Sequence, residues 1–451
     1  MPSSAPPPSA LPSLSDLPPF LLLHNPVRRY AWGSPTAIPA LTGTAPDGTP
    51  QAELWLGAHP SAPSLVAVPT HPAASPPPSS PAAAPGAGGP QPLDRLIAAD
   101  PDGLLGPDTV RRFGPELPLL FKVLAADRAL SLQVHPTRAQ AEAGYAAEEA
   151  RGVPPTAPER VFKDRGHKPE LICALSDFEA LCGFRPAADA AALLDALDVP
   201  LLAPWATVLR TRPEAEALPA LLRGALAADR PSPSELLTVA VALDRLAAAG
   251  GPYAEACAGY ARVAGQYPGD PGLLAALLLN HVRLAAGQAL YLDAGVPHAY
   301  LRGLGVELMA NSDNVLRCGL TPKHIDVDGL LAVTSFRTGR PGLITPSPSA
   351  TATATATATG IGIGIGIGIE EEFPSPAAEF RLSRLRPGAA ATRIELPTPQ
   401  ILLCVAGHAR LHAPDGTALA LPPGASAYLR PGAGPVGLTG PGAELFRATT
   451  G

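Results

Sequence analysis

Four side chains of the kinds that bind transition metals occur where the sequence predicts strands. Gln133 and His135 alternate with leucine and valine, so both side chains should lie on one face of a strand. Glu170 immediately precedes an apolar run, where a carboxylate is costly to bury unless it is paired or bound to a metal. His298 follows a Gly-Val-Pro turn at the start of a further predicted strand. Two imidazoles with oxygen ligands suit Zn²⁺ or another first-row ion and leave a position for water. The sequence therefore predicts an open metal site at Gln133, His135, Glu170 and His298.

Each part of this prediction has a plainer alternative. A strand with two exposed polar residues would account for Gln133 and His135. The charged stretch 163–170 could be a solvated surface loop. Only the combination of the pieces points to a metal.

Charged residues are dense again between positions 307 and 323. Arg317 stands in Val-Leu-Arg-Cys-Gly, among residues that are expected to be buried. A buried guanidinium needs a partner, which can be a carboxylate in a structural ion pair or an anionic ligand such as a phosphate. Both interpretations stay open from the residues alone. The charged residues in question are Glu307, Asp313, Arg317 and Lys323.

The composition limits the classes of function. The chain has 451 residues, with 33 lysines and arginines against 39 aspartates and glutamates, a formal net charge of −6. This mild acidity argues against nucleic acid or an anionic membrane as the main partner. The five cysteines form no Cys-x-x-Cys pair, which favours a reducing cytosol over a disulfide framework. No signal peptide and no run of roughly 20 apolar residues is evident, so we expect a cytoplasmic protein.

Three segments are predicted to be unstructured because proline, glycine, alanine or simple repeats dominate them. They are the N-terminal extension 1–19, the Pro/Ala-rich insertion 69–92 and the low-complexity linker 347–376. The linker contains Thr-Ala and Gly-Ile alternations followed by three glutamates at 370–372. We expect these glutamates to act as charged gatekeepers against wrong strand pairing.

The elements that must position the candidate residues are strands, interrupted by a helical block at 186–287. Ser232-Pro-Ser-Glu is a helix start signal with an N-cap serine, proline at the first helical position and a glutamate three residues after the cap. Gly250 should end that helix, and a second helix is predicted at 272–283. The last part of the chain alternates short apolar runs with Pro/Gly turns, which is typical of a small β-sandwich or barrel. We expect an all-helical insertion within a β protein.

Seven stretches form long and specific motifs: Asn25–Gly33, Ala52–Gly57, Phe121–Leu124, Leu130–Pro136, His167–Leu171, Gly295–Leu301 and Asn311–Lys323. Together they strongly resemble type I mannose-6-phosphate isomerases. The resemblance covers roughly residues 20–60 and 115–345, and both low-complexity insertions fall outside its motifs. It implies a mainly β fold of two cupin-like β-sandwich or jelly-roll domains with an inserted all-helical domain. The implied division is a catalytic domain at 20–185 and 288–346, a helical domain at 186–287 and a C-terminal cupin-like domain at 377–451.

The resemblance also implies a chemistry. Members of this family interconvert mannose 6-phosphate and fructose 6-phosphate through a cis-enediol(ate), within mannose metabolism and GDP-mannose biosynthesis. One Zn²⁺ per chain would be held by the four residues predicted above. Arg317 matches the family's active-site arginine, and Lys168, Glu307 and Asp313 are further catalytic candidates. We expect a monomer that acts on a small sugar phosphate. The residues that this resemblance places in or beside the substrate pocket are Trp32, Glu53, Lys122, Ser131, Tyr300 and Lys323.

The residues leave the general base open. Lys168 lies two residues before Glu170, where a bound metal could lower its pKa enough for it to accept a proton. Glu307, Asp313 and a metal-bound water are rivals, while Arg317 would stabilise negative charge on the enediolate. Two other functions fit the same residues. One is a non-catalytic metal-binding cupin that binds a sugar phosphate, and the other is an isomerase for another aldose.

The remaining histidines have no partner at ligand spacing, and we expect surface or core positions for them. His167 adjoins Lys168 and could border the site. The C-terminal β-region carries no His/Glu cluster, so we expect it to have a structural or lid role. The histidines without an assigned role are His24, His59, His71, His281, His324, His408 and His412.

Overall fold

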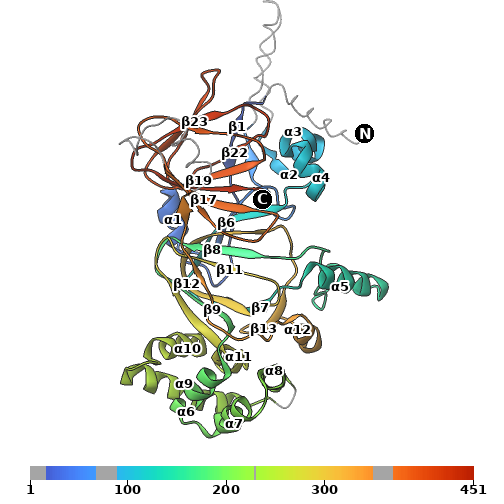
Figure 1. The fold of residues 1–451 in the computed structure, drawn as a ribbon, viewed down its shortest axis with the longest axis vertical. Coiled ribbons are helices and arrows are strands. Elements are labelled where there is room, and N and C mark those ends of the chain that lie inside the picture. Colours follow the sequence, from blue (N-terminus) through green and yellow to red (C-terminus); the bar gives the residue numbers. More distant parts are fainter. Residues whose placement is uncertain (1–16, 68–88, 228–229, 349–368) are drawn as a thin grey trace, which may run out of the picture.

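The computed structural model describes residues 17–67, 89–227, 230–348 and 369–451. These parts form three regions in a row along the long axis of the molecule (Figure 1). Strands of residues 369–451 lie at one end, a central sheet lies in the middle, and the helices of residues 187–277 lie at the other end. Helices take a share comparable to that of the strands, so the expected mainly β composition is too narrow. Within the described ranges, no helix combines the length and the apolar character needed to span a bilayer.

The strand β12 (His298–Ala310) runs through the middle of an 11-stranded sheet. Its second half pairs with β6 (Leu119–Ala126) on one side and with β8 (Glu170–Ala174) on the other. Its first half pairs with β7 (Leu132–Val134) and β9 (Phe178–Phe184) instead. One strand therefore links two groups of strands whose members alternate along the chain, β6 and β8 with β7 and β9. The other strands of this sheet are β2 (Val27–Arg28), β3 (Glu53–Leu56), β10 (Leu279–Leu284), β11 (Ala289–Leu292), β13 (Leu316–Gly319) and β14 (Leu343–Ile344).

The central strands form where the sequence has continuous apolar runs. Every residue of β6 and of β8 is buried, as expected for strands that are covered on both faces. Lys122 is the only charged residue of β6, and Glu170 is the only one of β8. The two buried charges therefore mark positions that apolar packing alone cannot explain.

The helical region begins and ends largely where the sequence predicts. Helix α9 (Pro233–Ala249) starts at Ser232, whose side chain accepts a hydrogen bond from the Glu235 amide, and Glu235 accepts one from the Ser232 amide in return. Gly250, with a positive φ of 77°, ends the helix, so the predicted capping box and stop signal are both confirmed. The other elements of this region are α6 (Ala187–Leu197), η2 (Pro200–Leu202), α7 (Ala203–Thr211), α8 (Glu214–Leu226), α10 (Ala254–Gln266) and α11 (Gly272–Leu277).

The predicted helix at 272–283 is wrong in its second half. Helix α11 stops at Leu277, and β10 (Leu279–Leu284) pairs antiparallel with β9. A short apolar run has no period long enough to separate helix from strand, so the pairing partner decides. The sequence analysis also did not identify the short helices outside this region. They are α1 (Ala37–Thr42), α2 (Leu93–Ala99), α3 (Pro101–Leu105), α4 (Pro107–Phe113), α5 (Arg138–Ala150) and α12 (Val327–Val333).

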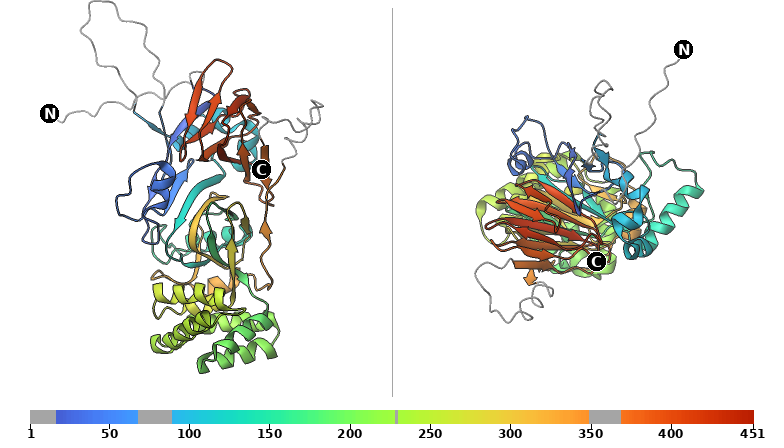
Figure 2. Two further views of the ribbon diagram at one scale, coloured as in Figure 1. Left: turned by 90° about the vertical axis from the view of Figure 1, so that its left-hand side faces the viewer. Right: turned by 90° about the horizontal axis from the view of Figure 1, so that it is seen from above.

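The C-terminal strands belong to a nine-stranded sheet that also contains the N-terminal strand β1 (Phe20–His24). β1 pairs antiparallel with β22 (Ser426–Leu429), so blue and red strands lie side by side in Figure 2. The predicted division placed residues 20–24 in the catalytic part, whereas their hydrogen bonds go to the C-terminal sheet. The other strands here are β4 (Leu65–Val66), β5 (Gln91–Pro92), β15 (Ser347–Pro348), β16 (Ile369–Phe373), β17 (Arg381–Arg386), β19 (Gln400–Ala406) and β24 (Glu444–Thr449).

A second, four-stranded sheet packs on the nine-stranded one. Its strands are β18 (Thr392–Ile394), β20 (Ala409–His412), β21 (Ala418–Leu421) and β23 (Val436–Thr439). Leu402 and Leu429 of the larger sheet share one apolar core with Leu411 and Leu438 of the smaller. The two sheets therefore enclose a common core, as the alternation of apolar residues with Pro/Gly turns predicted.

The predicted unstructured segments lie mostly outside the described residues, namely 1–16, 69–88 and the repeats up to 368. Where their ends are described, they are ordered. Leu17 is buried, and Arg430 donates hydrogen bonds to the carbonyls of Leu17 and Pro18. Of the predicted linker, residues 347–348 and 369–373 pair as β15 and β16. The expected gatekeepers at 370–372 form ion pairs within the C-terminal sheet, for example Glu371 with Arg384 at 2.7 Å.

Candidate active site and metal centre

Three of the four predicted metal ligands converge in the central sheet. His135 Nε2 lies 3.1 Å from Glu170 Oε1, and His298 Nε2 lies 3.4 Å from Glu170 Oε2. One ligand atom from each of these residues falls within 4.8 Å of the other two, and all three side chains are buried. Gln133, the fourth predicted ligand, places its amide nitrogen 3.2 Å from His298 Nε2. The four residues thus occupy one small volume.

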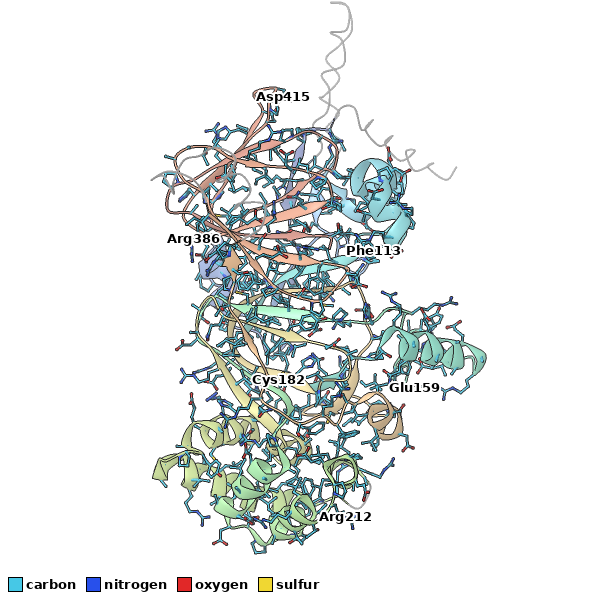
Figure 3. The ribbon with its side chains drawn as sticks, in the orientation of Figure 1. Phe113, Glu159, Cys182, Arg212, Arg386 and Asp415 are labelled. Carbon is cyan, nitrogen blue, oxygen red and sulfur yellow. The ribbon has the colours of Figure 1, made fainter. Side chains whose placement is uncertain are left out.

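Strand register brings these side chains together. His298 is the first residue of β12 and lies opposite Gln133 of β7 on one side and Cys182 of β9 on the other. The label on Cys182 in Figure 3 therefore marks the level of the cluster in the central sheet. Glu170, at the start of β8, lies opposite Met309 of β12.

The turn before β12 is tied to the segment that carries His135. Gly295, at a positive φ of 80°, donates its amide hydrogen bond to the His135 carbonyl over 2.8 Å. A side chain at this glycine would meet the Ser335 backbone at 3.1 Å, so the Gly-Val-Pro turn needs glycine for conformation and for space. The turn thereby fixes how His298 enters the cluster.

Hydrogen bonds on the far side of both imidazoles leave their Nε2 atoms for a ligand. His135 Nδ1 lies 2.7 Å from the Asn314 carbonyl, and His298 Nδ1 lies 2.9 Å from the Val296 carbonyl. A carbonyl can only accept, so each Nδ1 donates and each neutral ring keeps a lone pair on Nε2. This orientation of a ring by a backbone carbonyl is the usual arrangement at metal-binding histidines.

Two of the converging atoms are buried without a hydrogen-bond partner among the described residues, His135 Nε2 and Glu170 Oε2. Burial lowers the pKa of His135 to about 4, so its ring is neutral near pH 7. Burial alone would raise the pKa of Glu170, but Lys168 and His135 outweigh burial and bring this pKa well below its usual value. A neutral imidazole and an ionised carboxylate are the forms that bind a cation. The residues present therefore fit a divalent metal such as zinc.

A second group of buried charges adjoins the cluster. Lys122 Nζ lies 3.2 Å from Glu307 and 3.4 Å from Glu53, and the Trp55 indole donates a hydrogen bond to Glu53 over 2.7 Å. Burial alone would lower the pKa of Lys122, but Glu53 and Glu307 outweigh burial and raise it. Burial raises the pKa of Glu307. Lys168 Nζ lies 3.1 Å from Glu170 Oε1 and so contacts the group of predicted metal ligands directly.

Arg317 lies on β13 opposite Gln133, so its backbone is next to one of the predicted metal ligands. Its side chain is partly buried, and burial lowers its pKa. Within the described residues no hydrogen bond or ion pair engages its guanidinium, and the carboxylate of Asp313 lies 3.6 Å from His59 Nε2 instead. The structural ion pair that the sequence left open as an alternative is therefore absent from the described part of the chain. A half-buried unpaired guanidinium favours an anionic ligand.

The other predicted pocket residues differ in their burial and in their contacts. Tyr300 is buried with its hydroxyl unpartnered among the described side chains, and burial raises its pKa well above the usual value. Trp32 is partly buried and stacks on Tyr30 with ring centroids 5.7 Å apart. Ser131 is partly buried directly before β7, and Lys323 is exposed. Burial and the charge of Arg317 both lower the pKa of Lys323.

Some contacts around the site were missed from the sequence. His59 was expected at a surface or core position without a partner at ligand spacing; it is buried, lies 3.6 Å from Asp313, and lowers the pKa of that carboxyl. Asn314 binds the backbone of residues 163–166 through its side chain while its carbonyl orients His135. No periodicity links such distant positions, so the sequence offered no signal for them.

Two sizeable cavities lie beside the cluster rather than around it. One, of about 650 Å³, lies between the helical region and residues 321–325 and includes Lys323 in its lining. The other, of about 760 Å³, lies between the C-terminal segment 376–379 and the chain around His167. None of the four predicted metal ligands lines either cavity.

Comparison with known proteins gives a consistent match. Residues 20–187 match the family description "Phosphomannose isomerase type I, catalytic domain". The mannose-6-phosphate isomerases of Salmonella typhimurium and Escherichia coli are each 37% identical to this chain, over 93% of it and 97% of their own lengths. A crystal structure of the Salmonella typhimurium enzyme, bound to its substrate fructose 6-phosphate and zinc, superposes with a TM-score of 0.79 at 35% identity. That likeness covers 96% of this chain and 99% of the other.

Proposed function

The chain belongs to the type I phosphomannose isomerases, and on that premise we propose that it is a zinc-dependent aldose–ketose isomerase. It interconverts mannose 6-phosphate and fructose 6-phosphate through a cis-enediol(ate). The observation that carries this proposal is the buried group of His135, Glu170 and His298, in which two ligand atoms have no hydrogen-bond partner among the described residues. Arg317, at the strand position opposite Gln133, has no ion-pair partner in the same part of the chain. The full-length match to mannose-6-phosphate isomerases supports the substrate pair.

Gln133, His135, Glu170 and His298 would hold one Zn²⁺ per chain. When bound, zinc supplies a Lewis acid that polarises a carbonyl or hydroxyl oxygen. His135 and Glu170 are already in the protonation states that bind a cation near neutral pH, because His135 has a pKa of about 4 and the pKa of Glu170 is lowered. Little rearrangement is then needed when the metal binds, since backbone carbonyls fix both rings.

The reaction moves a proton between carbons 1 and 2 of the sugar, and negative charge develops on oxygen as it does so. Arg317 stabilises that charge, since its guanidinium has no competing carboxylate among the described residues. Lys168, Glu307 and Asp313 are the side chains proposed to carry protons. Glu307 suits a carrier because burial raises its pKa toward neutral values. Lys168, 3.1 Å from Glu170, is the candidate nearest to the metal ligands.

The remaining candidates bind and orient the substrate. Arg317 lies close enough to Lys323 to lower the pKa of that lysine. The two side chains together therefore offer two positive charges to the sugar phosphate. Lys122 is neutralised by Glu53 and Glu307, which fits an orienting contact to sugar hydroxyls better than a phosphate contact. Trp32, Ser131 and Tyr300 are proposed to line the same pocket.

We also keep the cupin-like interpretation of the fold as a proposal. Residues 20–185 and 288–346 would form the catalytic cupin-like unit, 186–287 the helical unit and 377–451 the second cupin-like unit. The strands β1, β4 and β5 extend this second unit from the N-terminal part. A monomer in the cytoplasm, acting on a small sugar phosphate without nucleic acid or membrane, fits the five free cysteines and the mild negative charge.

One purified sample can test this function. Zinc content is measured, and formation of fructose 6-phosphate from mannose 6-phosphate is followed in a coupled assay. We expect about one zinc per chain, turnover that a chelator abolishes, and recovery on adding zinc. Zinc binding without turnover of mannose 6-phosphate would contradict the proposal and leave a metal-binding sugar-phosphate protein or an isomerase for another aldose, which a panel of aldoses distinguishes.

A further inference from the structure

The carboxylate of Glu379 connects the C-terminal region to the chain around the metal cluster. Glu379 lies two residues before β17 and is buried, with 6% of its surface exposed. Its Oε1 accepts hydrogen bonds from His167 Nε2 at 2.7 Å and from Arg138 Nη2 at 2.8 Å. Its Oε2 is buried with no hydrogen-bond partner among the described residues. The charge of this carboxylate is therefore compensated mainly by two side chains from the central region.

Both partners stand three residues from a proposed metal ligand. Arg138 is the first residue of α5 and follows His135 along the chain. His167 precedes Glu170 and is the direct neighbour of Lys168, whose ammonium lies 3.1 Å from Glu170. One carboxylate from the C-terminal region thus holds the two segments that lead into β8 and out of β7.

The carboxylate at the centre of the link is buried and charged, whereas the Arg138 side chain is 54% exposed and that of His167 27%. Burial alone would raise the pKa of Glu379, but the His167 ring and the Arg138 guanidinium outweigh burial and bring it to about 2. The carboxylate is therefore ionised near pH 7. Removing its charge would leave both donors without a charged acceptor, with the larger effect at His167, which is less exposed than Arg138.

The surroundings give the linked segment room to move if the link is broken. The cavity of about 760 Å³ beside Glu379 is lined by His167, Arg138 and Tyr291 as well as by Glu379 itself. Close packing therefore does not hold His167 on this side, and the hydrogen bond to Glu379 does.

We propose that Glu379 is a positioning residue for the active site: it fixes His167 and Arg138, and through them the segments that carry Lys168 and the metal ligands. This assigns the C-terminal region a specific task in addition to a structural one. The inference rests on the proposed isomerase function for its catalytic consequence, but its consequence for zinc binding stands independently.

The test replaces Glu379 by glutamine, which keeps the shape and removes the charge. Glu444→Gln is the matched control, because Glu444 also lies in the C-terminal sheet and accepts a hydrogen bond from an arginine, Arg386, at 3.0 Å, with no hydrogen bond or ion pair to the central sheet among the described residues. The zinc dissociation constant is measured by chelator competition, and kcat and KM are measured at saturating zinc. For E379Q we expect zinc affinity and kcat each to fall roughly tenfold with KM changed less than about twofold, and for E444Q no change.

A double-mutant cycle separates positioning from a general loss of structure. In a background that carries both His167→Gln and Arg138→Gln, E379Q should lower kcat no further, because both contacts to Glu379 are already broken. The proposal would be overturned if E379Q lowered kcat by the same factor in this background as on its own. It would also be overturned if E379Q bound zinc and turned over like E444Q. If E379Q does not fold, H167Q alone carries the test: it must lower zinc affinity about tenfold, and an unchanged affinity overturns the proposal. If the unmutated chain binds zinc without isomerase activity, the proposed function fails. The zinc dissociation constants of E379Q and E444Q still decide the role of Glu379 in that case.

Discussion

Two buried glutamates in consecutive strands of the central sheet, both paired with β12, contrast a structural charge with a proposed metal ligand. Glu170 of β8 and Glu179 of β9 are both buried and both contact histidines. Glu179 is fully compensated: its oxygens meet Arg262 at 2.7 Å, Arg302 at 2.9 Å and His281 at 3.5 Å. The Glu170 group instead leaves an oxygen and a ring nitrogen buried without a hydrogen-bond partner in the described structure.

The difference lies in what surrounds each carboxylate. Around Glu179, the chain supplies two guanidiniums from the rim, with side chains 32% and 53% exposed, so no further cation is needed. Around Glu170, both histidines turn lone pairs toward the carboxylate because their Nδ1 atoms are bound to carbonyls. A buried polar atom without a partner is rare in stable proteins, and here two such atoms converge. Single unpaired buried atoms also occur elsewhere in the described structure, for example at Glu379 and Thr392, so it is the convergence of two such atoms on one buried carboxylate that supports the proposed metal site.

The most direct test of this comparison makes the same substitution at Glu170 and at Glu179. Glu170→Gln should lower zinc affinity by more than about 100-fold and remove activity with it, because it removes a ligand charge. Glu179→Gln should leave zinc affinity and the activity of the folded protein unchanged. Zinc competition with a chelator and the coupled assay measure both. An active, metal-free E170Q protein would defeat the ligand assignment.

The arginines of the two regions offer the second comparison. Arg317→Ala should lower kcat about 100- to 1000-fold with normal zinc content, since it removes a donor to the developing oxyanion. Arg262→Ala, which removes an arginine already paired with Glu179, should change kcat little. Metal analysis and kcat are measured on both. Unchanged turnover in R317A would show that the electrostatic role is wrong.

Stability should respond in the opposite order. Glu179→Gln should lower the free energy of unfolding by roughly 2 kcal/mol, because two arginines and a histidine lose their common acceptor while remaining partly solvated. Glu170→Gln should change the stability of the zinc-free protein less, since Lys168 is its one lysine or arginine partner among the described residues and one of its oxygens has no hydrogen-bond partner there. Denaturant unfolding of both zinc-free variants measures the difference. A larger loss in E170Q than in E179Q would reverse the interpretation of the two clusters.

The smallest effect concerns pH. The hydrogen bond from His281 lowers the pKa of Glu179 to about 2, with burial opposing it and Arg262 and Arg302 adding to it. A depressed carboxyl pKa contributes stability above the unfolded-state value of about 4.5, and this contribution is lost as pH falls through about 2. The stability gap between the unmutated zinc-free chain and E179Q should therefore narrow as pH falls from 6 toward 3. A gap that does not depend on pH would mean that the charge of Glu179 is not what stabilises the cluster.

Local patterns in the sequence predicted much of what positions the site. The alternation around Gln133 and His135, the apolar run after Glu170 and the Gly-Val-Pro turn before His298 each correspond to a strand or turn in the structure. The capping box at Ser232 marks the start of a helix to the residue. These features are short-range, and short-range physical rules determine them.

Contacts between distant segments were out of reach of such patterns. The pairing of β1 with β22, the approach of His59 to Asp313 and the link from Glu379 to His167 each join residues far apart in the chain. The second half of the predicted helix at 272–283 is wrong for the same reason, because β9 recruits those residues as a strand. A single polar residue produces no periodic pattern in the sequence, so its contact partner cannot be predicted without the three-dimensional structure.

X-ray absorption at the zinc edge of the zinc-loaded, unmutated chain tests the central claim most directly. The account predicts a zinc bound only by nitrogen and oxygen, with outer-shell scattering from two imidazoles, as His135 and His298 require. Sulfur in the first coordination shell, or the absence of imidazole scattering, would place the metal elsewhere and contradict the account.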